Sequence, residues 1–153
     1  METVIVTGAA GGMGQAIVKK LIADGYHVAG IDLAEESLYS HPNFYYEQGN
    51  ALDEEQMKAF AGKADSIAGL VNALGIAQSA APIEEVSMEF WNKVMDVNVK
   101  SLFVSTKAVA AKMKQARKGA IVNIASISAG RPRPGLQAYI ASKGAAESFT
   151  RAM

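Results

Sequence analysis

Between a short apolar run and a helical pattern, the chain reads Thr7-Gly8-Ala9-Ala10-Gly11-Gly12-Met13-Gly14. The run Val4-Ile5-Val6 predicts a buried strand, and the apolar periodicity from Gly12 to Asp24 predicts a helix. Glycines at such a junction permit a tight turn that brings backbone N–H groups close to a bound anion, and the helix start adds partial positive charge. We therefore expect Gly8, Gly12, Met13 and Gly14 to hold the pyrophosphate of a dinucleotide. A plain glycine-rich turn is the alternative, but the position of the motif between a strand and a helix favours dinucleotide binding.

Short apolar runs and helical patterns alternate through the rest of the chain. Further strands are predicted over 27–32, 44–46, 67–72 and 119–125, and further helices over 53–61, 87–114 and from 139 to the end. Such alternation requires right-handed crossovers and a parallel sheet with helices on both faces. We therefore expect one α/β domain over 1–153, a Rossmann-type doubly wound parallel sheet with strand order 3-2-1-4-5. Its ligand crevice should lie at the carboxyl ends of the strands.

The composition argues against several classes of protein. Basic and acidic residues number 15 each among 153 residues, so no basic surface for nucleic acid is indicated. There is no cysteine, which excludes disulfides, cysteine-based zinc sites and thiol catalysis. The apolar runs are too short and too often interrupted by charge for a membrane span, and the first residues lack the pattern of a signal peptide. We expect a cytoplasmic protein that binds neither metal, nucleic acid nor membrane.

Asp32 ends the second predicted strand. A carboxylate at this point can accept hydrogen bonds from the ribose hydroxyls of adenosine. The same charge would repel a 2′-phosphate, and neither the glycine-rich turn nor the residues just after Asp32 contain a Lys or Arg that would offset the repulsion. The pattern favours NAD over NADP; the alternative is that Asp32 only caps a turn.

Near the end of the chain, Tyr139-Ile140-Ala141-Ser142-Lys143 places a phenol and an ammonium on one face of a helix. Positive charge beside a phenol stabilises its deprotonated form, so the pair can act as a general acid and base near neutral pH. An ordinary surface pair has the same spacing, so this motif alone is not specific. Ser126 follows the fifth predicted strand, where its hydroxyl can hold a substrate oxygen; Ser128 is the competing candidate.

Asn98 stands among apolar residues of the long predicted helix. A polar side chain in that position indicates a hydrogen-bonded core amide or a local kink, and a functional role is the alternative.

Taken in order, these motifs resemble the short-chain dehydrogenase/reductase family over essentially the whole chain. The motifs that carry the resemblance are the glycine-rich turn, Asp32, Asn72-Ala73-Leu74-Gly75, Asn98, Ser126 and Tyr139 to Lys143. The resemblance implies an oxidoreductase that transfers a hydride between NAD(H) and a small alcohol or ketone. It implies that Ser126 polarises the substrate oxygen and Tyr139 exchanges the proton. It also implies that Lys143 binds the nicotinamide ribose and that Asn98 supports a water relay to it.

The resemblance further implies cofactor contacts from Asn50, Ala51, Asn72 and Gly75, beside those of Tyr139 and Lys143. Three positions depart from the family pattern: the usual Asn-Asn-Ala-Gly is Asn72-Ala73-Leu74-Gly75 here, so the second amide is gone and a bulkier Leu74 follows, and Asn50 stands where an Asp is common. Asn72 can still brace neighbouring strands, and Asn50 can still bind adenine as donor and acceptor.

Length is the largest departure from the family. Members continue past the helix that carries Tyr and Lys, so the resemblance implies a chain that lacks the family's last strands and is incomplete at its C-terminus. When intact, such a protein is expected to form a homo-oligomer through its long and terminal helices. Two alternatives to the enzyme are a non-catalytic NAD-binding fragment and a helix-mediated interaction module.

Overall fold

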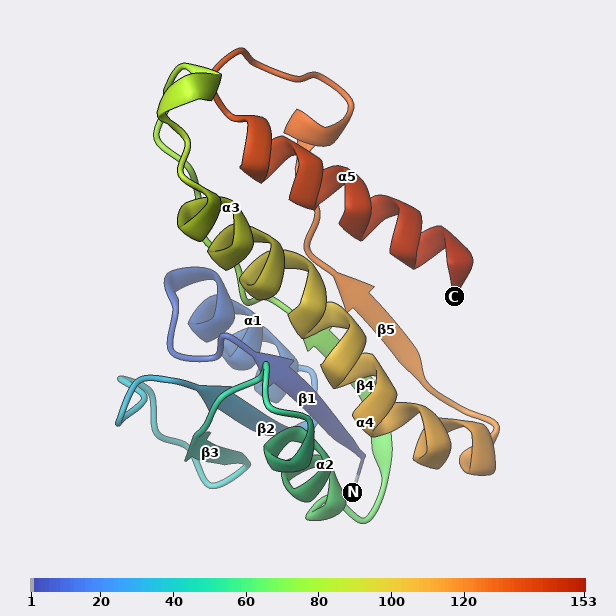
Figure 1. Ribbon diagram of the computed structural model, residues 1–153. Helices are drawn as coiled ribbons and strands as arrows, with labels where there is room; N and C mark the ends of the chain where they lie inside the picture. Colours follow the sequence, from blue (N-terminus) through green and yellow to red (C-terminus); the bar gives the residue numbers. More distant parts are fainter. Residues whose placement is uncertain (1) are drawn as a thin grey trace.

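Five parallel strands form a single sheet in the order β3-β2-β1-β4-β5 (Figure 1). The computed structural model describes residues 2–153. The strands are β1 Thr3–Thr7, β2 His27–Asp32, β3 Phe44–Gln48, β4 Ile67–Asn72 and β5 Ala120–Asn123. The Rossmann-type strand order predicted from the sequence is therefore confirmed.

Helices cover both faces of this sheet. They are α1 Gly12–Ala23, α2 Glu54–Gly62, α3 Met88–Met95, α4 Ser101–Ala116 and α5 Gln137–Ala152. Short 3-10 turns lie at Ile83–Glu85 (η1) and Ile127–Ala129 (η3). Asp53 caps α2 as predicted, because its side chain accepts a hydrogen bond from Gln56 N–H. Gly25, with a φ of 89°, follows the end of α1.

The two apolar cores follow from the alternation of side chains along the strands. On one face, Val4 and Val6 of β1 pack with Val18 and Ile22 of α1. On the other face, the intervening Ile5 packs into the core formed with α2 and α4, whose buried members include Phe60, Val104 and Val109. Because both faces are covered, successive residues in the middle of the central strands are apolar, as is typical of parallel sheets.

The long helix predicted over 87–114 is not regular, which corrects the sequence prediction. Ser87 caps α3, and a π-helical turn, Asp96–Lys100 (η2), separates α3 from α4. Asn98 lies in this π-helical turn and is buried, as expected for a core amide at a local irregularity of the helix. Smaller differences concern element ends: β3 extends to Gln48, β5 is confined to Ala120–Asn123, and α5 begins at Gln137.

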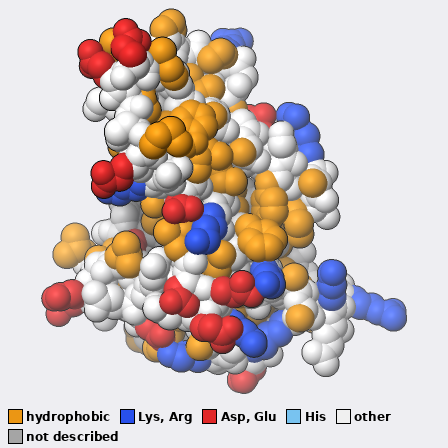
Figure 2. Space-filling view, viewed as in Figure 1, with side chains coloured by type: hydrophobic (Ala, Val, Ile, Leu, Met, Phe, Trp, Pro, Cys, Tyr) orange, Lys and Arg blue, Asp and Glu red, His pale blue; other side chains and the backbone are white. Residues whose placement is uncertain are grey.

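Apolar side chains gather on the surface over α3, α4 and the neighbouring part of α5, whereas charged side chains gather over α2 (Figure 2). Met88 of α3 and Phe103 of α4 are 69% and 53% exposed. No helix within residues 2–153 is both long and apolar enough to cross a bilayer.

Candidate active site

A cleft of about 320 Å³ runs from the glycine-rich turn to the start of α5, at the carboxyl ends of β1, β4 and β5. Among its lining residues are seven that the sequence singled out, Gly8, Gly12, Met13, Gly14, Gly75, Tyr139 and Lys143. Ligands of open parallel sheets bind at this edge, where the strand order reverses. Segments from both ends of the chain therefore meet in one crevice.

The turn between β1 and α1 can be built only from glycine at two positions. Gly8 has a φ of 70°, and a Cβ there would lie 2.8 Å from the backbone nitrogen of Leu74. A Cβ on Gly14 would lie 2.0 Å from the carbonyl oxygen of Gly8. These contacts are backbone to backbone, so the turn folds back against the start of α1 and against the segment after β4. The N-terminus of α1 faces the cleft as a result, which suits an anion.

Asp32 lies beside the same turn, at the carboxyl end of β2. Its Oδ2 accepts a hydrogen bond from Ala10 N–H at 3.1 Å, and its Oδ1 accepts one from Ala34 N–H at 3.3 Å. The side chain is half-buried, so both oxygens keep further lone pairs for other donors. The alternative in which Asp32 caps a local turn is therefore compatible with the binding role predicted for it.

Tyr139 and Lys143 share one face of α5, as their spacing predicted. The ammonium of Lys143 lies 5.8 Å from the centre of the Tyr139 ring. It donates a hydrogen bond to the carbonyl oxygen of Ile124 at 2.8 Å, which anchors it at the end of β5. Burial lowers the pKa of Lys143. One ammonium proton is used by Ile124, and the others remain for hydroxyls in the cleft.

Asn98 fastens two walls of the cleft together. Its Oδ1 accepts from Ile76 N–H at 2.8 Å, and its Nδ2 donates to Ile76 O at 3.0 Å and to Ser142 Oγ at 2.9 Å. All of these contacts are to protein atoms and both amide protons are used, so the side chain has no proton left for a water. The amide joins the segment after β4 to α5, one turn away from Tyr139.

Ser126 does not line the cleft itself but directly follows Ala125, which does. Its Oγ accepts a hydrogen bond from Ser128 N–H at 3.1 Å and caps the turn η3. A hydroxyl that accepts keeps its own proton for donation. Ser128, the competing candidate, contributes its backbone N–H to this arrangement.

Three further residues expected at the cofactor have side chains engaged elsewhere. Ala51 is buried in the core beneath α2. Asn50 Oδ1 accepts from Leu52 N–H at 3.0 Å in a local turn. Asn72 is buried and braces the sheet, because its Oδ1 accepts from Ser105 Oγ at 2.6 Å and its Nδ2 donates to Asn123 Oδ1 at 2.8 Å. Their contacts with a cofactor stay predictions. Such contacts would have to come from backbone atoms or from side-chain atoms that are not already hydrogen-bonded.

The hydrogen bonds of Asn72 belong to a chain that reaches α5. Asn123 Nδ2 donates to Thr150 Oγ1 at 2.9 Å, and Thr150 donates to Ala146 O at 2.7 Å. Together with Ser105, this chain ties α4, β4, β5 and α5 to one another. It fixes the far end of α5 to the sheet, while Asn98 fixes the near end.

A sequence profile of the short chain dehydrogenase family matches residues 2–153. The chain belongs to this family. It is 36% identical to a cyclopentanol dehydrogenase of Comamonas testosteroni and 34% identical to a 3-oxoacyl-[acyl-carrier-protein] reductase of Rickettsia conorii. Each alignment covers 99% of this chain and 65% of the relative, so the chain spans about two-thirds of the length of these curated relatives.

Solved structures of dehydrogenases superpose on nearly the whole chain. Serine dehydrogenase of Escherichia coli matches with a TM-score of 0.92 and 28% identity, over 98% of this chain and 74% of that one. The ligand-free aldohexose dehydrogenase of Thermoplasma acidophilum matches with a TM-score of 0.88 and 30% identity, over 99% and 59%. The short-chain dehydrogenase fold described above is thus shared with both proteins.

One residue that contacts Tyr139 was not singled out from the sequence. Gln78, on the segment after β4, accepts a hydrogen bond from Tyr139 N–H at 3.1 Å. A signal was present, because Leu136 precedes α5 and its side chain cannot cap a helix. A helix without a local cap needs an acceptor from another segment.

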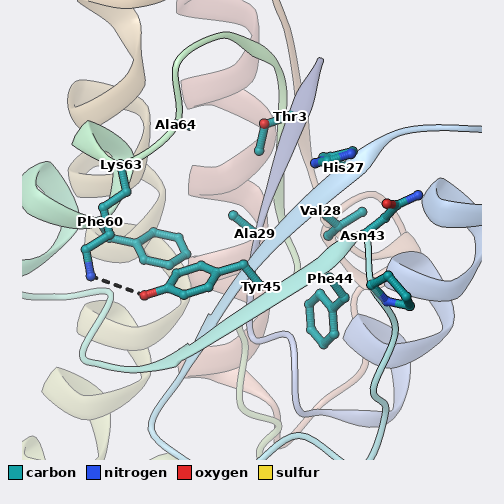
Figure 3. Close-up of a pocket in the computed structure, with 11 residues that line it drawn as sticks. Thr3, His27, Val28, Ala29, Asn43, Phe44, Tyr45, Phe60, Lys63 and Ala64 are labelled. Carbon is teal, nitrogen blue, oxygen red and sulfur yellow. Dashed lines mark hydrogen bonds between the residues drawn. The ribbon is translucent and has the colours of Figure 1, made fainter. Parts of the chain in front are cut away.

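A larger cavity, of about 540 Å³, lies at the opposite edge of the sheet, where β1, β2 and β3 begin (Figure 3). Phe44, Tyr45 and Phe60 supply aromatic walls, and Lys63 donates a hydrogen bond to the Tyr45 hydroxyl at 3.2 Å. His27, also in its lining, has a buried Nε2 with no hydrogen-bond partner among residues 2–153. Because it lies at the amino ends of the strands, away from Tyr139, we do not assign the chemistry to it.

Proposed function

We propose that this chain supplies the cofactor-binding and catalytic residues of an NAD(H)-dependent alcohol dehydrogenase or ketone reductase. The observation that carries the proposal is the single cleft that joins the glycine-rich turn to Tyr139 and Lys143. Family membership and the names of the relatives support oxidoreductase chemistry, since those proteins are named dehydrogenases and reductases.

The cleft suits a nicotinamide dinucleotide. Close backbone contacts at Gly8 and Gly14 exclude any side chain at these two positions. A pyrophosphate can therefore approach the start of α1 there without meeting a side chain. Asp32 would bind the adenosine ribose hydroxyls, and the free ammonium protons of Lys143 would bind those of the nicotinamide ribose. The cofactor, when bound, supplies hydride transfer.

The protein's own contribution is to hold and move a proton. In the reductive direction, Tyr139 donates its phenolic proton to the oxygen of the ketone, and it takes that proton back when the alcohol is oxidised. Ser126 donates a hydrogen bond to the same oxygen, since its Oγ already accepts from Ser128 N–H. Lys143, held in place by Ile124, keeps its ammonium 5.8 Å from the centre of the ring that exchanges the proton.

We propose NAD rather than NADP as cofactor, because the carboxylate of Asp32 is held against the turn by Ala10 N–H and would repel a 2′-phosphate. As substrate class we propose small secondary alcohols and the corresponding ketones. The dehydrogenase of Comamonas testosteroni is named for cyclopentanol, which makes this alcohol a suitable first probe.

The proposal is tested by calorimetric titration of the purified chain with NADH and NADPH, and by turnover of cyclopentanol with NAD. We expect tighter binding of NADH, a preference that Asp32→Ala removes. We expect Tyr139→Phe to abolish turnover and to keep the affinity for NADH. An active Tyr139→Phe variant would refute the proton role, and equal affinities of the wild type for both cofactors would refute the assignment of Asp32.

One observation favours an additional interaction role. Apolar side chains gather on the surface over α3 and α4, beside α5 (Figure 2). Met88 of α3 and Phe103 of α4 are among the exposed apolar side chains of these helices. We propose that this face joins two copies of the protein. If the chain binds NADH and self-associates but shows no turnover, the two alternative functions, a cofactor-binding fragment and an interaction module, are favoured over the enzyme.

A further inference from the structure

The first turn of α5 is capped by a residue from a distant segment. Leu136 stands at the N-cap position, and no side chain there bonds to the helix. Backbone N–H groups in the first turn of any helix have no partner within the helix. Tyr139 N–H donates to Gln78 Oε1 at 3.1 Å, so Gln78 acts in place of a local cap.

We propose that Gln78 is a positioning residue for Tyr139, which it holds against the cofactor cleft by capping α5 from the segment after β4. This inference rests on the proposed function, because it concerns the placement of the same proton-transferring phenol. Gln78 itself touches neither substrate nor cofactor in this scheme.

The orientation of the Gln78 side chain is fixed by further hydrogen bonds. Its Nε2 donates to Gln137 Oε1 at 3.2 Å, and Gln137 Nε2 donates to Ala81 O at 3.2 Å. Ala81 N–H donates in turn to Gly135 O at 3.1 Å, on the backbone that leads into α5. Gln78 therefore presents its oxygen, and not its nitrogen, to Tyr139.

The segment that carries Gln78 also forms a wall of the cleft, through Ile76 and Ala77. Asn98 already binds this wall at Ile76 and binds α5 at Ser142. Gln78 adds a hydrogen bond between the same two segments at Tyr139 itself. Without it, the segments stay joined by the bond from Gln137 to Ala81 and by Asn98 one turn later, but Tyr139 N–H loses its acceptor and the first turn of α5 can fray.

Displacement of a catalytic group is costly even when binding is unaffected. A misplacement of about 1 Å can lower a rate by about 100-fold. The cofactor contacts expected at Gly8, Gly14 and Asp32 lie on other elements, and Lys143, the cofactor contact expected on α5, is held one turn later by its own hydrogen bond to Ile124 O. Loss of the cap should therefore lower kcat and leave cofactor affinity unchanged, a division that general loss of stability would not produce.

The contact is tested first by amide hydrogen exchange, measured by NMR on the chain without cofactor. Gln78→Leu removes the acceptor and keeps most of the volume, Gln78→Glu keeps an acceptor oxygen, and Gln115→Leu on the exposed side of α4 is the matched control. We expect Tyr139 N–H to exchange about five-fold faster or more in Gln78→Leu, and near the wild-type rate in the other two. Unchanged protection of this amide in Gln78→Leu would overturn the proposal.

The second measurement is turnover of cyclopentanol with NAD. We expect Gln78→Leu to lower kcat by about 10- to 100-fold with unchanged KM for NAD, and Gln78→Glu to recover much of that loss. If the wild type turns over and Gln78→Leu keeps its kcat, the positioning role is wrong while the proposed function stands. If the wild type shows no turnover, the proposed function fails, and the exchange data decide by themselves whether Gln78 caps α5.

Discussion

Replacing Gly14 by alanine places one methyl group against the backbone of the glycine-rich turn. The new Cβ would lie 2.0 Å from Gly8 O, 2.8 Å from Gly8 C and 2.9 Å from Ala9 Cα. None of these atoms is the end of a flexible side chain, so the turn and α1 must separate until the shortest distance reaches ordinary contact. Gly144→Ala is the matched control, because nothing lies within 4 Å of the Cβ it would add in the interior of α5.

The two substitutions add the same atoms and should change stability in opposite directions. Forcing extra volume into a packed site costs about 1–3 kcal/mol, and a contact between backbone atoms places Gly14→Ala near the upper end. Alanine in place of glycine inside a helix gains about 0.5–1 kcal/mol, which Gly144→Ala should realise. The two variants should therefore differ by about 3–4 kcal/mol in free energy of unfolding, or roughly 10 °C in Tm.

Urea unfolding followed by circular dichroism measures both free energies, and calorimetry with NADH measures the effect on the turn. We expect Gly14→Ala to be the less stable variant and to bind NADH more weakly, because its turn has moved. Gly144→Ala should be more stable than the wild type with unchanged affinity. If Gly14→Ala were as stable as the wild type and bound NADH equally well, the close packing of the turn would not be the reason for glycine there.

Three further predictions concern stability. Burial lowers the pKa of Lys143, so at low pH the charged ammonium destabilises the folded chain. As pH rises, Lys143 loses its proton in the folded chain before it does so in the unfolded chain. Relative to Lys143→Met, the wild type should thus gain unfolding free energy as pH rises from the lowered pKa toward the ordinary value of 10.5. Lys112→Met should cost about 1–2 kcal/mol, because the ammonium donates to three carbonyl oxygens at the end of α2. Ser105→Ala should cost about 1–3 kcal/mol, because it removes the closest donor to the buried Asn72 Oδ1.

Urea unfolding checks all three. Parallel pH profiles of the wild type and Lys143→Met would contradict the first prediction. For the second, Lys114→Met on the exposed side of α4 is the control, and equal losses in both variants would remove the capping explanation. For the third, the exposed Ser148 supplies the control through Ser148→Ala, which should leave stability within about 0.5 kcal/mol of the wild type.

The sheet could be predicted from the sequence because its signals are local. Apolar runs at Val4-Ile5-Val6 and at 67–72, with glycines directly after the first, determine where strands end and helices begin, and crossover handedness then fixes the strand order. The shared face of Tyr139 and Lys143 is equally local, since it needs only a helix. These features were accordingly found at the expected residues.

What could not be predicted depends on contacts between distant segments. The π-helical turn holds Asn98 where its amide reaches Ile76, and no periodicity within residues 87–114 reveals such a partner. Asn72 was expected to brace neighbouring strands and does so through Asn123 of β5, but its second partner, Ser105 of α4, could not be read from the sequence. The partner of Gln78 could be identified only once the segment after β4 was placed beside α5.

The π-helical turn also constrains the number of residues that this part of the chain can have. A π-helical turn holds one residue more than an α-helical turn over nearly the same rotation, so removing one residue from Asp96–Lys100 would restore a regular helix and leave α3 and α4 in nearly the same phase. Val104 and Val109 would still pack against the sheet, but the amide of Asn98 would no longer be placed to reach both Ile76 and Ser142. Removing a residue within α4 instead would rotate everything after it by about 100° and turn its apolar face away from the sheet. Among natural variants that keep the cleft, chain length in this turn should therefore vary less than the identity of its exposed side chains.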